Sequence, residues 1–375
     1  MIIYIIHLLV AFVFALPFVG KEFLSYNLWW VCVGIRAYLV TYLLLRPWIK
    51  FCRHYRLLDY PDERKIHLQP VPRLGGVAIF LTVFFMSFNY WRVFPYLEAL
   101  VLSVSIIFIV GLCDDLWGVS AKLRLIAQIL AVIIAIRGGI TITFLPHCPG
   151  EYIWEAIITG VWLIGITNAI NFLDGIDGLV AGLAVISCSL FFVIGWVTQQ
   201  NVLVYITIAL AGSCLGMIPY NFKFWSRTKK SEIFLGDAGS TTIGFILANV
   251  AVLGGWNVEN PVVALSTPLL ILGVAIFDIS YISISRMHRG AIHNFREWIE
   301  YVGHDHFHHR LVRLGFSEKG AVIFIYTLSF LLGLNALVIR HLGSKESFAL
   351  LSQSLLVFSL IAILMVVGGR NSNFK

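Results

Sequence analysis

The sequence is poor in charge. Only 13% of its 375 residues are Asp, Glu, Lys or Arg, whereas 59% are hydrophobic and the mean hydropathy is +0.87. Soluble domains carry about twice that share of charged residues. A water-soluble enzyme, a disordered protein and a nucleic-acid-binding protein are therefore excluded, and the lipid bilayer is the expected solvent.

The sequence also lacks the marks of several other classes. Its six cysteines form no C-x-x-C pair, which argues against a disulfide framework or a thiolate zinc site. No internal repeat and no Pro-, Gly- or Ser-rich linker divides the chain, so residues 1–375 are expected to form a single membrane domain. The apolar N-terminus has no Lys or Arg before Lys21, so residues 1–27 predict an additional retained helix, not a cleaved signal peptide.

Long apolar runs fill most of the chain, and a membrane-spanning helix needs about 20 such residues. The runs predict an all-α integral membrane protein, a polytopic bundle of about eleven transmembrane helices, or twelve if the first run also spans. They cover residues 2–20, 28–48, 75–91, 94–112, 123–137, 153–171, 178–197, 201–219, 240–256, 260–284, 320–340 and 347–367.

Basic residues favour one orientation of this bundle. If the loop after the second run is cytoplasmic, alternation of the spans places these segments inside: 46–73, 113–124, 172–177, 220–239, 286–319 and the tail from 368. Elsewhere the only Lys and Arg residues are Lys21, Arg36, Arg92, Arg137, Arg340 and Lys345. This asymmetry follows the positive-inside rule.

Polar residues gather in five clusters, all on the predicted cytoplasmic side. Any one cluster could be a solvated helix end, but five on one face indicate an assembled site. The clusters are 61–67 with 71–76, the pair Asp114-Asp115, the run from Asn168 to Gly178, the run from Gly236 to Ser240, and the run from His304 to Arg310.

The acidic residues of these clusters suit a hard cation. Crowded carboxylates repel one another, and Mg²⁺ or Mn²⁺ commonly joins protein carboxylates to substrate phosphates. The sequence therefore predicts a divalent metal ion among Asp114, Asp115, Asp174, Asp177 and Asp237.

Glycines indicate where these acids lie. The glycines in Asp174-Gly175-Ile176-Asp177-Gly178 predict that a helix ends there and that both acids lie on a surface loop. Gly236 and Gly239 would let the backbone approach a ligand closely. Ser240 and Thr241 are expected to cap the next helix, whose N-terminus favours phosphate, although a simple capped turn is the alternative.

Cationic and aromatic side chains are the remaining candidate site residues. The run His304-Asp305-His306-Phe307-His308-His309-Arg310 has no accompanying thiolate, so we favour donors to a nucleotide-sugar diphosphate over zinc ligands. Lys122 and Arg124 lie where a lipid phosphate would meet the membrane surface, or are ordinary positive-inside anchors. Phe234 is a candidate to stack on a base, or belongs to the aromatic belt of the membrane.

Taken in order, these motifs resemble the polyprenyl-phosphate N-acetylhexosamine-1-phosphate transferase superfamily (glycosyltransferase family 4). The resemblance covers residues 46–311, and five motifs in the family's order are a far stronger signal than any one. Three marks, namely Arg73, the G-D-A-G-S form at 236–240 and the H-x-H-H-R-L ending at 306–311, are similar to the branch that transfers GlcNAc-1-phosphate or a related sugar, not to the muramoyl-pentapeptide branch.

The resemblance implies a reaction and its partners. A UDP-N-acetylhexosamine, first of all UDP-GlcNAc, would give its sugar-1-phosphate to undecaprenyl phosphate or another polyprenyl phosphate, with Mg²⁺ as cofactor. UMP and a polyprenyl-diphospho-sugar would be the products, and the active site would face the cytoplasm at the inner (plasma) membrane. The lipid product would start a cell-surface glycan, such as the O-antigen of lipopolysaccharide or a cell-wall teichoic acid.

Several alternatives stay open. The donor could instead carry GalNAc, FucNAc or a diamino sugar, and the enzyme could be a homodimer. A cation- or proton-coupled transporter is the alternative from a different class. Ionisable residues of transporters normally lie near mid-membrane, whereas these clusters lie at one surface, and this disfavours the transporter.

The resemblance also implies roles for single residues. Asp237 is similar to the family's direct Mg²⁺ ligand, with Asp177 and Asp115 in support. Asp114 matches a residue proposed to deprotonate the lipid phosphate, although a covalent role for an Asp has also been proposed. The catalytic set would be Asp114, Asp115, Asp174, Asp177, His306, His308 and His309. Nucleotide-sugar contacts would fall on Asn168, Asn171, Phe234, Gly236, His308, His309 and Arg310, and lipid-phosphate contacts on Lys122 and Arg124.

One departure from the family concerns the last motif. Gly303 stands where the family often has an Asp, three residues before the first His of the H-x-H-H-R-L motif. The displaced Asp305 or His304 is a candidate to compensate.

Overall fold

The structure is a computed structural model. It describes residues 2–15, 28–60, 69–88, 90, 93–94, 96–143, 150–223, 231–256, 260–294, 297, 303 and 305–372. The predicted motif at 61–67, as well as Cys148 and His304, lies outside these residues. The five described cysteines are free thiols, as expected.

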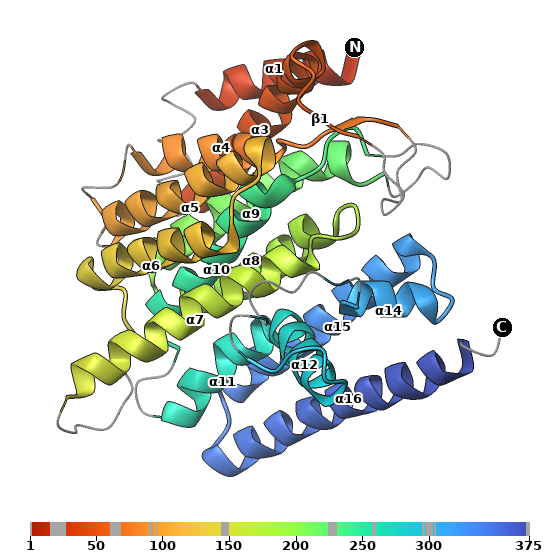
Figure 1. The fold of residues 1–375 in the computed structure, drawn as a ribbon. Coiled ribbons are helices and arrows are strands. Elements are labelled where there is room, and N and C mark those ends of the chain that lie inside the picture. The colour runs from red at the N-terminus through yellow and green to blue at the C-terminus, as the bar shows by residue number, and fades with distance from the viewer. Residues whose placement is uncertain are drawn as a thin grey trace.

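Helices make up nearly all of the described chain, and each predicted apolar run contains one (Figure 1). Their bounds are α1 (Ile2–Ala15), α3 (Trp29–His54), α4 (Gly76–Phe88), α5 (Leu97–Trp117), α6 (Ala121–Arg137), α7 (Glu151–Leu173), α8 (Leu179–Val197), α9 (Asn201–Asn221), α10 (Gly236–Leu253), α11 (Pro261–Ile271), α12 (Gly273–His288), α14 (Phe307–Arg313), α15 (Glu318–Ile339) and α16 (Ser344–Ser372).

Eight helices of the described chain are long and apolar enough to cross a membrane, namely α3, α5, α7, α8, α9, α10, α15 and α16. The pair α11 and α12 forms a ninth candidate, bent by 81° between the two helices. Helices α4 and α6, with 13 and 17 residues, are shorter. The chain is therefore a polytopic membrane protein, while the count of eleven or twelve spans stays a prediction.

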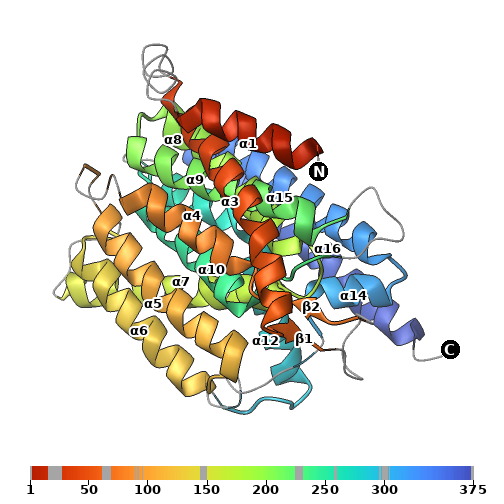
Figure 2. The same cartoon turned by 90° about the horizontal axis from the view of Figure 1, so that it is seen from above.

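Helix α10 lies inside the bundle, in contact with α4, α5, α7, α8 and α9 (Figures 1 and 2). In its most apolar stretch 78% of the residues are buried, against 11% for α16. Small residues allow this close packing. A Cβ at Gly76 of α4 would lie only 2.2 Å from the Cα of Gly239, so the two backbones touch at the start of α10.

Two short strands lie beside this contact, a feature that the hydropathy pattern does not predict. Strands β1 (Leu58–Asp59) and β2 (Val71–Pro72) pair antiparallel. On its other side the β2 segment binds the chain that leads into α10. Phe234 N donates to Pro72 O at 2.8 Å, and Gly75 N donates to Phe234 O at 2.9 Å. These bonds place Arg73 at the N-terminus of α10.

Candidate active site

The first turn of α10 lies against the end of α5. Asp115 Oδ1 accepts a hydrogen bond from Asp237 N at 2.9 Å, and Oδ2 accepts one from Ala238 N, also at 2.9 Å. The Asp115 side chain is fully buried. A carboxylate in this position satisfies N–H groups that have no partner inside the helix and complements the positive end of its dipole.

A glycine permits this approach. Gly236 has φ +76°, and a Cβ there would lie 2.3 Å from Arg73 O and 2.6 Å from Asp115 Oδ2. The groups that approach Gly236 belong to the protein itself, and the predicted approach of a ligand stays a prediction.

The prediction that Ser240 and Thr241 cap this helix is wrong. Helix α10 already begins at Gly236, so both hydroxyls lie within it. Ser240 Oγ donates to Gly236 O at 3.1 Å, and Thr241 Oγ1 donates to Asp237 O at 2.6 Å. The cap comes from Asp115, which is 122 residues away from Asp237 in the chain, and no local sequence pattern indicates such a partner.

Arg73 joins two of the predicted acids. Its Nε lies 2.9 Å from Asp115 Oδ1, and its Nη2 lies 3.3 Å from Asp237 Oδ2. Burial alone would lower the pKa of Arg73, but the surrounding carboxylates, Asp115 first, raise it, so the guanidinium stays charged. Arg73 belongs to the second half of the first motif, and the sequence reasoning gave it no role in the site.

Asp237 is held on its other side by α7. Asn171 Nδ2 donates to Asp237 Oδ1 at 2.9 Å and to Ser240 Oγ at 2.9 Å. Asn168, one turn earlier, instead forms a reciprocal amide pair with Gln128 of α6 at 3.0 and 3.2 Å. The structure therefore brings Asn171 to Asp237 and places Asn168 between α6 and α7.

Helix α7 ends at Leu173 and α8 begins at Leu179, so Asp174 and Asp177 lie on the turn between them, as predicted. Burial, followed by the negative charges of Asp237, Asp115 and Asp177, raises the pKa of Asp174 well above its usual value. The four acids thus repel one another, with Arg73 as the cation in their midst. A further cation or a bound proton would relieve that repulsion.

The donor set fits a hard divalent cation, although it is not arranged as a finished metal site. Within the described ranges, no three His, Cys, Asp or Glu side chains form a group that could hold a metal ion. The Asp237 side chain is 29% exposed, whereas Asp115 is fully buried and both its oxygens bind N–H groups. Asp237 is therefore better placed than Asp115 to bind Mg²⁺ directly, and carboxylate oxygens are the ligands that Mg²⁺ prefers.

Two polar side chains that the sequence reasoning missed fix the turn after α7. Asn221, the last residue of α9, accepts from Gly178 N at 2.8 Å and donates to Ile233 O at 3.0 Å. Tyr326 OH of α15 donates to Gly178 O at 2.6 Å. These bonds anchor the acidic turn to α9 and α15. In the sequence, Tyr326 is a polar side chain inside the apolar run 320–340, and Asn221 lies just beyond the run 201–219.

The histidine motif faces the same turn. His308 Nε2 packs against Gly175, where an added Cβ would lie only 2.1 Å away. The His308 and His309 ring centroids are 4.2 Å apart, and the Phe172 ring lies 5.4 Å from that of His306. The structure thus brings the predicted histidines next to the Asp174 turn.

A buried acid, Asp278 of α12, anchors the start of this motif. Its Oδ2 lies 2.8 Å from His306 Nδ1, and its Oδ1 accepts from Phe307 N at 2.6 Å. Asp278 lies inside the apolar run 260–284, and the sequence reasoning did not single it out.

Asp305 forms a second anchor through ion pairs. Its carboxylate lies 2.5 Å from Arg286 Nη2 and 2.8 Å from Arg289 Nη2. Burial would raise the pKa of Asp305, but hydrogen bonds and charge from the two arginines lower it to about 2. Arg310 Nε donates to Asp305 O at 2.7 Å, and its guanidinium lies 4.8 Å from the centre of the Tyr281 ring. Arg310 is therefore tied to α12.

The turn between α5 and α6 brings two further predicted residues together. Asp114 Oδ2 lies 2.8 Å from Arg124 Nη1, and Asp114 Oδ1 accepts from Val119 N at 2.6 Å. Lys122 is exposed in the first turn of α6, and Phe234 is partly exposed beside β2. The predicted base and a predicted phosphate-binding cation are thus in contact.

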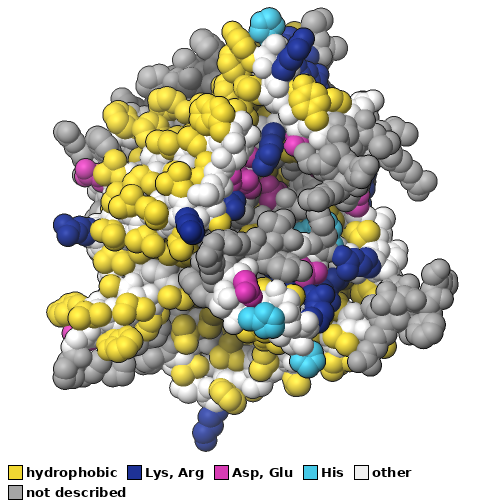
Figure 3. All heavy atoms as spheres, in the orientation of Figure 1, with side chains coloured by type: hydrophobic (Ala, Val, Ile, Leu, Met, Phe, Trp, Pro, Cys, Tyr) yellow, Lys and Arg dark blue, Asp and Glu magenta, His cyan; other side chains and the backbone are white. Residues whose placement is uncertain are grey.

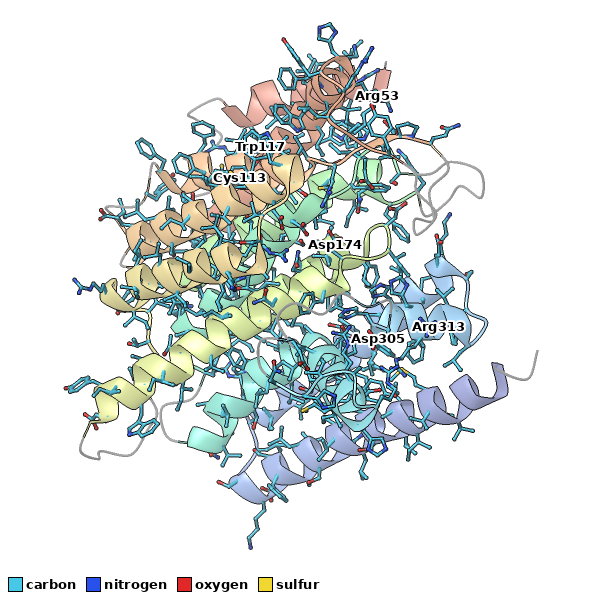
Figure 4. All side chains as sticks on the ribbon, viewed as in Figure 1. Arg53, Cys113, Trp117, Asp174, Asp305 and Arg313 are labelled. Carbon is cyan, nitrogen blue, oxygen red and sulfur yellow. The ribbon has the colours of Figure 1, made fainter. Side chains whose placement is uncertain are left out.

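In Figure 4 the labelled Asp174 lies near the middle of the bundle, with Asp305 and Arg313 below it and to the right. In the space-filling view of Figure 3, acidic side chains are set back among Lys and Arg side chains near the centre of the visible face. Acids within a rim of cations suit an anionic substrate bound through a metal ion.

Comparison with known proteins decides the family. Residues 97–255 match the profile of glycosyl transferase family 4. The chain is also 30% identical over 354 residues to the probable undecaprenyl-phosphate N-acetylglucosaminyl 1-phosphate transferase of Bacillus subtilis (strain 168), covering 92% of this chain and 94% of that protein. The chain belongs to this family, the polyprenyl-phosphate N-acetylhexosamine-1-phosphate transferase superfamily.

Other members of this superfamily are similar to the chain over most of its length. The decaprenyl-phosphate N-acetylglucosaminephosphotransferase of Mycobacterium tuberculosis (strain CDC 1551 / Oshkosh) is 30% identical over 328 residues, 78% of each chain. The undecaprenyl-phosphate alpha-N-acetylglucosaminyl 1-phosphate transferase of Escherichia coli (strain K12) is 26% identical over 336 residues, 87% of this chain and 88% of that one. The resemblance inferred from the motifs is confirmed.

Proposed function

We propose that the protein transfers N-acetylhexosamine-1-phosphate, with GlcNAc-1-phosphate as the first expectation, from a UDP-sugar to a polyprenyl phosphate. An oxygen of the acceptor phosphate attacks the β-phosphorus of the donor, the one that carries the sugar. The bond from that phosphorus to the bridging oxygen breaks, and UMP leaves with the electron pair. The reaction starts a cell-surface glycan at the cytoplasmic face of the inner (plasma) membrane.

The observation that carries this proposal is the placement of Asp237. It lies in the first turn of α10, bound by Asn171 and Arg73, and its charge reaches Asp174 on the turn after α7. The histidine motif packs against the same turn through His308 and Gly175. Acids on one side and histidines on the other suit a diphosphate bound through a cation, with donors to its remaining oxygens.

We assign the donor to this pocket. Asp237, with Asp177 and Asp115 in support, would hold Mg²⁺, which when bound neutralises charge on the diphosphate. His308 and His309 would donate to the diphosphate and the sugar, His306 would complete the catalytic set, and Asn171 and Phe234 would hold the uridine. Three other residues were predicted to contact the UDP-sugar, namely Asn168, Gly236 and Arg310. In the structure they contact other protein groups, so they would act through the residues that they position.

We assign the acceptor to the turn between α5 and α6. Arg124 and the exposed Lys122 would bind the lipid phosphate at the membrane surface. Asp114 would take a proton from that phosphate. Its carboxylate contacts Arg124, so a phosphate bound to Arg124 would lie within its reach. A phosphate that binds Arg124 would then lie next to Asp114 without further rearrangement, and positioning of this kind supplies much of the rate in phosphoryl transfer.

The test is a panel of radiolabelled UDP-sugars given to the purified protein with undecaprenyl phosphate. We expect label in the organic-phase lipid and release of UMP with Mg²⁺, and neither with EDTA. The sugar that labels the lipid names the donor. Absence of labelled lipid with every donor, from a protein shown to be folded, would refute the proposed reaction.

A further inference from the structure

Asp278 is an ionisable residue within the bent apolar segment formed by α11 and α12, and its side chain is only 1% exposed. An unpaired carboxylate in such a place is costly, so its partners indicate what it does. Both of its oxygens bind the histidine motif. Oδ2 lies 2.8 Å from His306 Nδ1, and Oδ1 accepts from Phe307 N at 2.6 Å.

The first bond determines which ring nitrogen faces the substrate. A carboxylate oxygen accepts hydrogen bonds, so the proton of His306 is on Nδ1 and points at Asp278. Among the described residues, Nε2 of His306 has no hydrogen-bond partner. Nε2 is thus the nitrogen left for a ligand.

The ring of His306 lies within the site. Its centroid is 6.1 Å from that of His308, with the two planes only 10° apart, and His308 Nε2 touches Gly175 of the acidic turn. The Phe172 ring covers another side at 5.4 Å. The second bond of Asp278, to Phe307 N, fixes the backbone next to the ring, so Asp278 restrains both the position and the rotation of His306.

We propose that Asp278 is a positioning residue for the transfer reaction, because it orients His306 with Nδ1–H toward itself and leaves Nε2, as an acceptor of a hydrogen bond or a proton, facing the substrate. The chemistry is that of carboxylate–histidine pairs generally, in which an outer acid fixes the tautomer and raises the basicity of the ring. The expected effect of Asp278 on the transfer rate rests on the proposed function. The expected position of the proton on His306 Nδ1 does not.

The kinetic test is a double-mutant cycle of Asp278→Asn and His306→Asn. Asn at 278 keeps the side-chain shape but cannot accept at both positions, so we expect kcat/KM to fall by about 10- to 100-fold. If Asp278 acts through His306, the double variant will be no slower than His306→Asn alone. The proposal would be overturned if Asp278→Asn kept the wild-type kcat/KM. It would also be overturned if the fold-loss of kcat/KM in the double variant equalled the product of the losses in the two single variants.

A matched control separates this effect from loss of a buried polar group. Thr267 of α11 is fully buried, and its Oγ1 donates to Val263 O at 2.9 Å within the same bent segment. Thr267→Val should keep wild-type kcat/KM, whereas an equal loss in both variants would assign the effect to packing and overturn the proposal.

A measurement on the unaltered chain keeps the proposal testable if Asp278→Asn does not fold. In ¹⁵N-histidine NMR of the detergent-solubilised protein, with His306 assigned by comparison with His306→Asn, Nδ1 should carry a proton. A proton on Nε2 alone would overturn the proposal. If no sugar donor gives a lipid product, the proposed function fails, and this ring-nitrogen result still decides the role of Asp278.

Discussion

The two halves of the site are held in different ways. On the acidic side, backbone meets backbone or a buried carboxylate, as in the contact of Gly76 with Gly239 and the bonds from Asp115 to the start of α10. On the histidine side, charged side chains form the links, as between Asp305, Arg286 and Arg289. The first half combines close backbone packing with the ion pairs of Arg73, whereas the second relies on charged side chains, so substitutions at the close backbone contacts and at the ion pairs should fail for different reasons.

The largest effect is expected from Asp237→Asn. Loss of the charge removes the proposed metal ligand while Asn keeps the shape, so transfer should fall by about 100-fold or more with the fold intact. The rate of Mg²⁺-dependent lipid labelling and the thermal midpoint measure the two quantities. Glu232→Gln, which alters only the partly exposed pair with Lys223, is the control and should keep its activity. Retained activity in Asp237→Asn would remove Asp237 from the metal site.

The next largest effect concerns the packed half. Gly236→Ala would place a Cβ 2.3 Å from Arg73 O at φ +76°, so clash and backbone strain should together lower the free energy of unfolding by about 3 kcal/mol or more. Gly118→Ala is the matched control, because Gly118 has φ +72° with nothing within 4 Å of its added Cβ. It should cost about 1 kcal/mol. Equal thermal midpoints would show that the close approach at Gly236 is not needed.

A smaller effect, dependent on pH, is expected from the charged half. Asp305 has a pKa of about 2 in the folded protein and an ordinary value near 3.8 when unfolded, so the unfolded chain binds more protons between these values. The ion pairs therefore stabilise the fold fully above pH ~5 and lose that stabilisation progressively as the pH falls through 4 toward 2. Thermal midpoints between pH 6 and 3 should fall more steeply in the natural chain than in Asp305→Asn. Parallel curves would contradict this.

The smallest effect is expected from Tyr281→Phe. The change removes the hydroxyl that accepts from Arg310 Nη1 at 3.2 Å and keeps the ring under the guanidinium. We expect a loss of about 1 kcal/mol or less. Tyr281→Leu removes both contacts and should cost more. Thermal unfolding of the two variants, side by side, would show whether the ring or the hydroxyl holds Arg310, and a larger loss in Tyr281→Phe would refute the ring contact.

The sequence predicted the elements of this molecule better than their partners. Hydropathy located the helices apart from α14 and the bend that divides the run 260–284 into α11 and α12, and the glycines correctly placed the end of α7 before Asp174. The order of the motifs identified the family. It also predicted that Asp237, Asn171 and His308 belong to one site. The cap of α10 was mispredicted because its partner, Asp115, is distant in the chain, and distance in sequence hides such contacts.

Asp278 and Asn221 were missed for a related reason. Asp278 is a single polar residue in an apolar run, a pattern equally typical of a membrane helix with one tolerated polar side chain, and Asn221 is an isolated amide just beyond the end of another run. Their roles become visible only in the structure, where α12 packs against the histidine motif and α9 packs against the acidic turn. The two strands escaped notice because a ladder of two residues has no periodicity.

The cap on α10 also bears on the order in which the protein is made. Asp115 leaves the ribosome 122 residues before Asp237, the first of its two peptide partners. At about 5–20 residues per second, that interval lasts roughly 6–24 s. Throughout it, the two N–H groups that bind the Asp115 carboxylate do not yet exist, whereas Arg73, its ion-pair partner, is already in the chain. The active site therefore closes only after more than half of the chain has been translated.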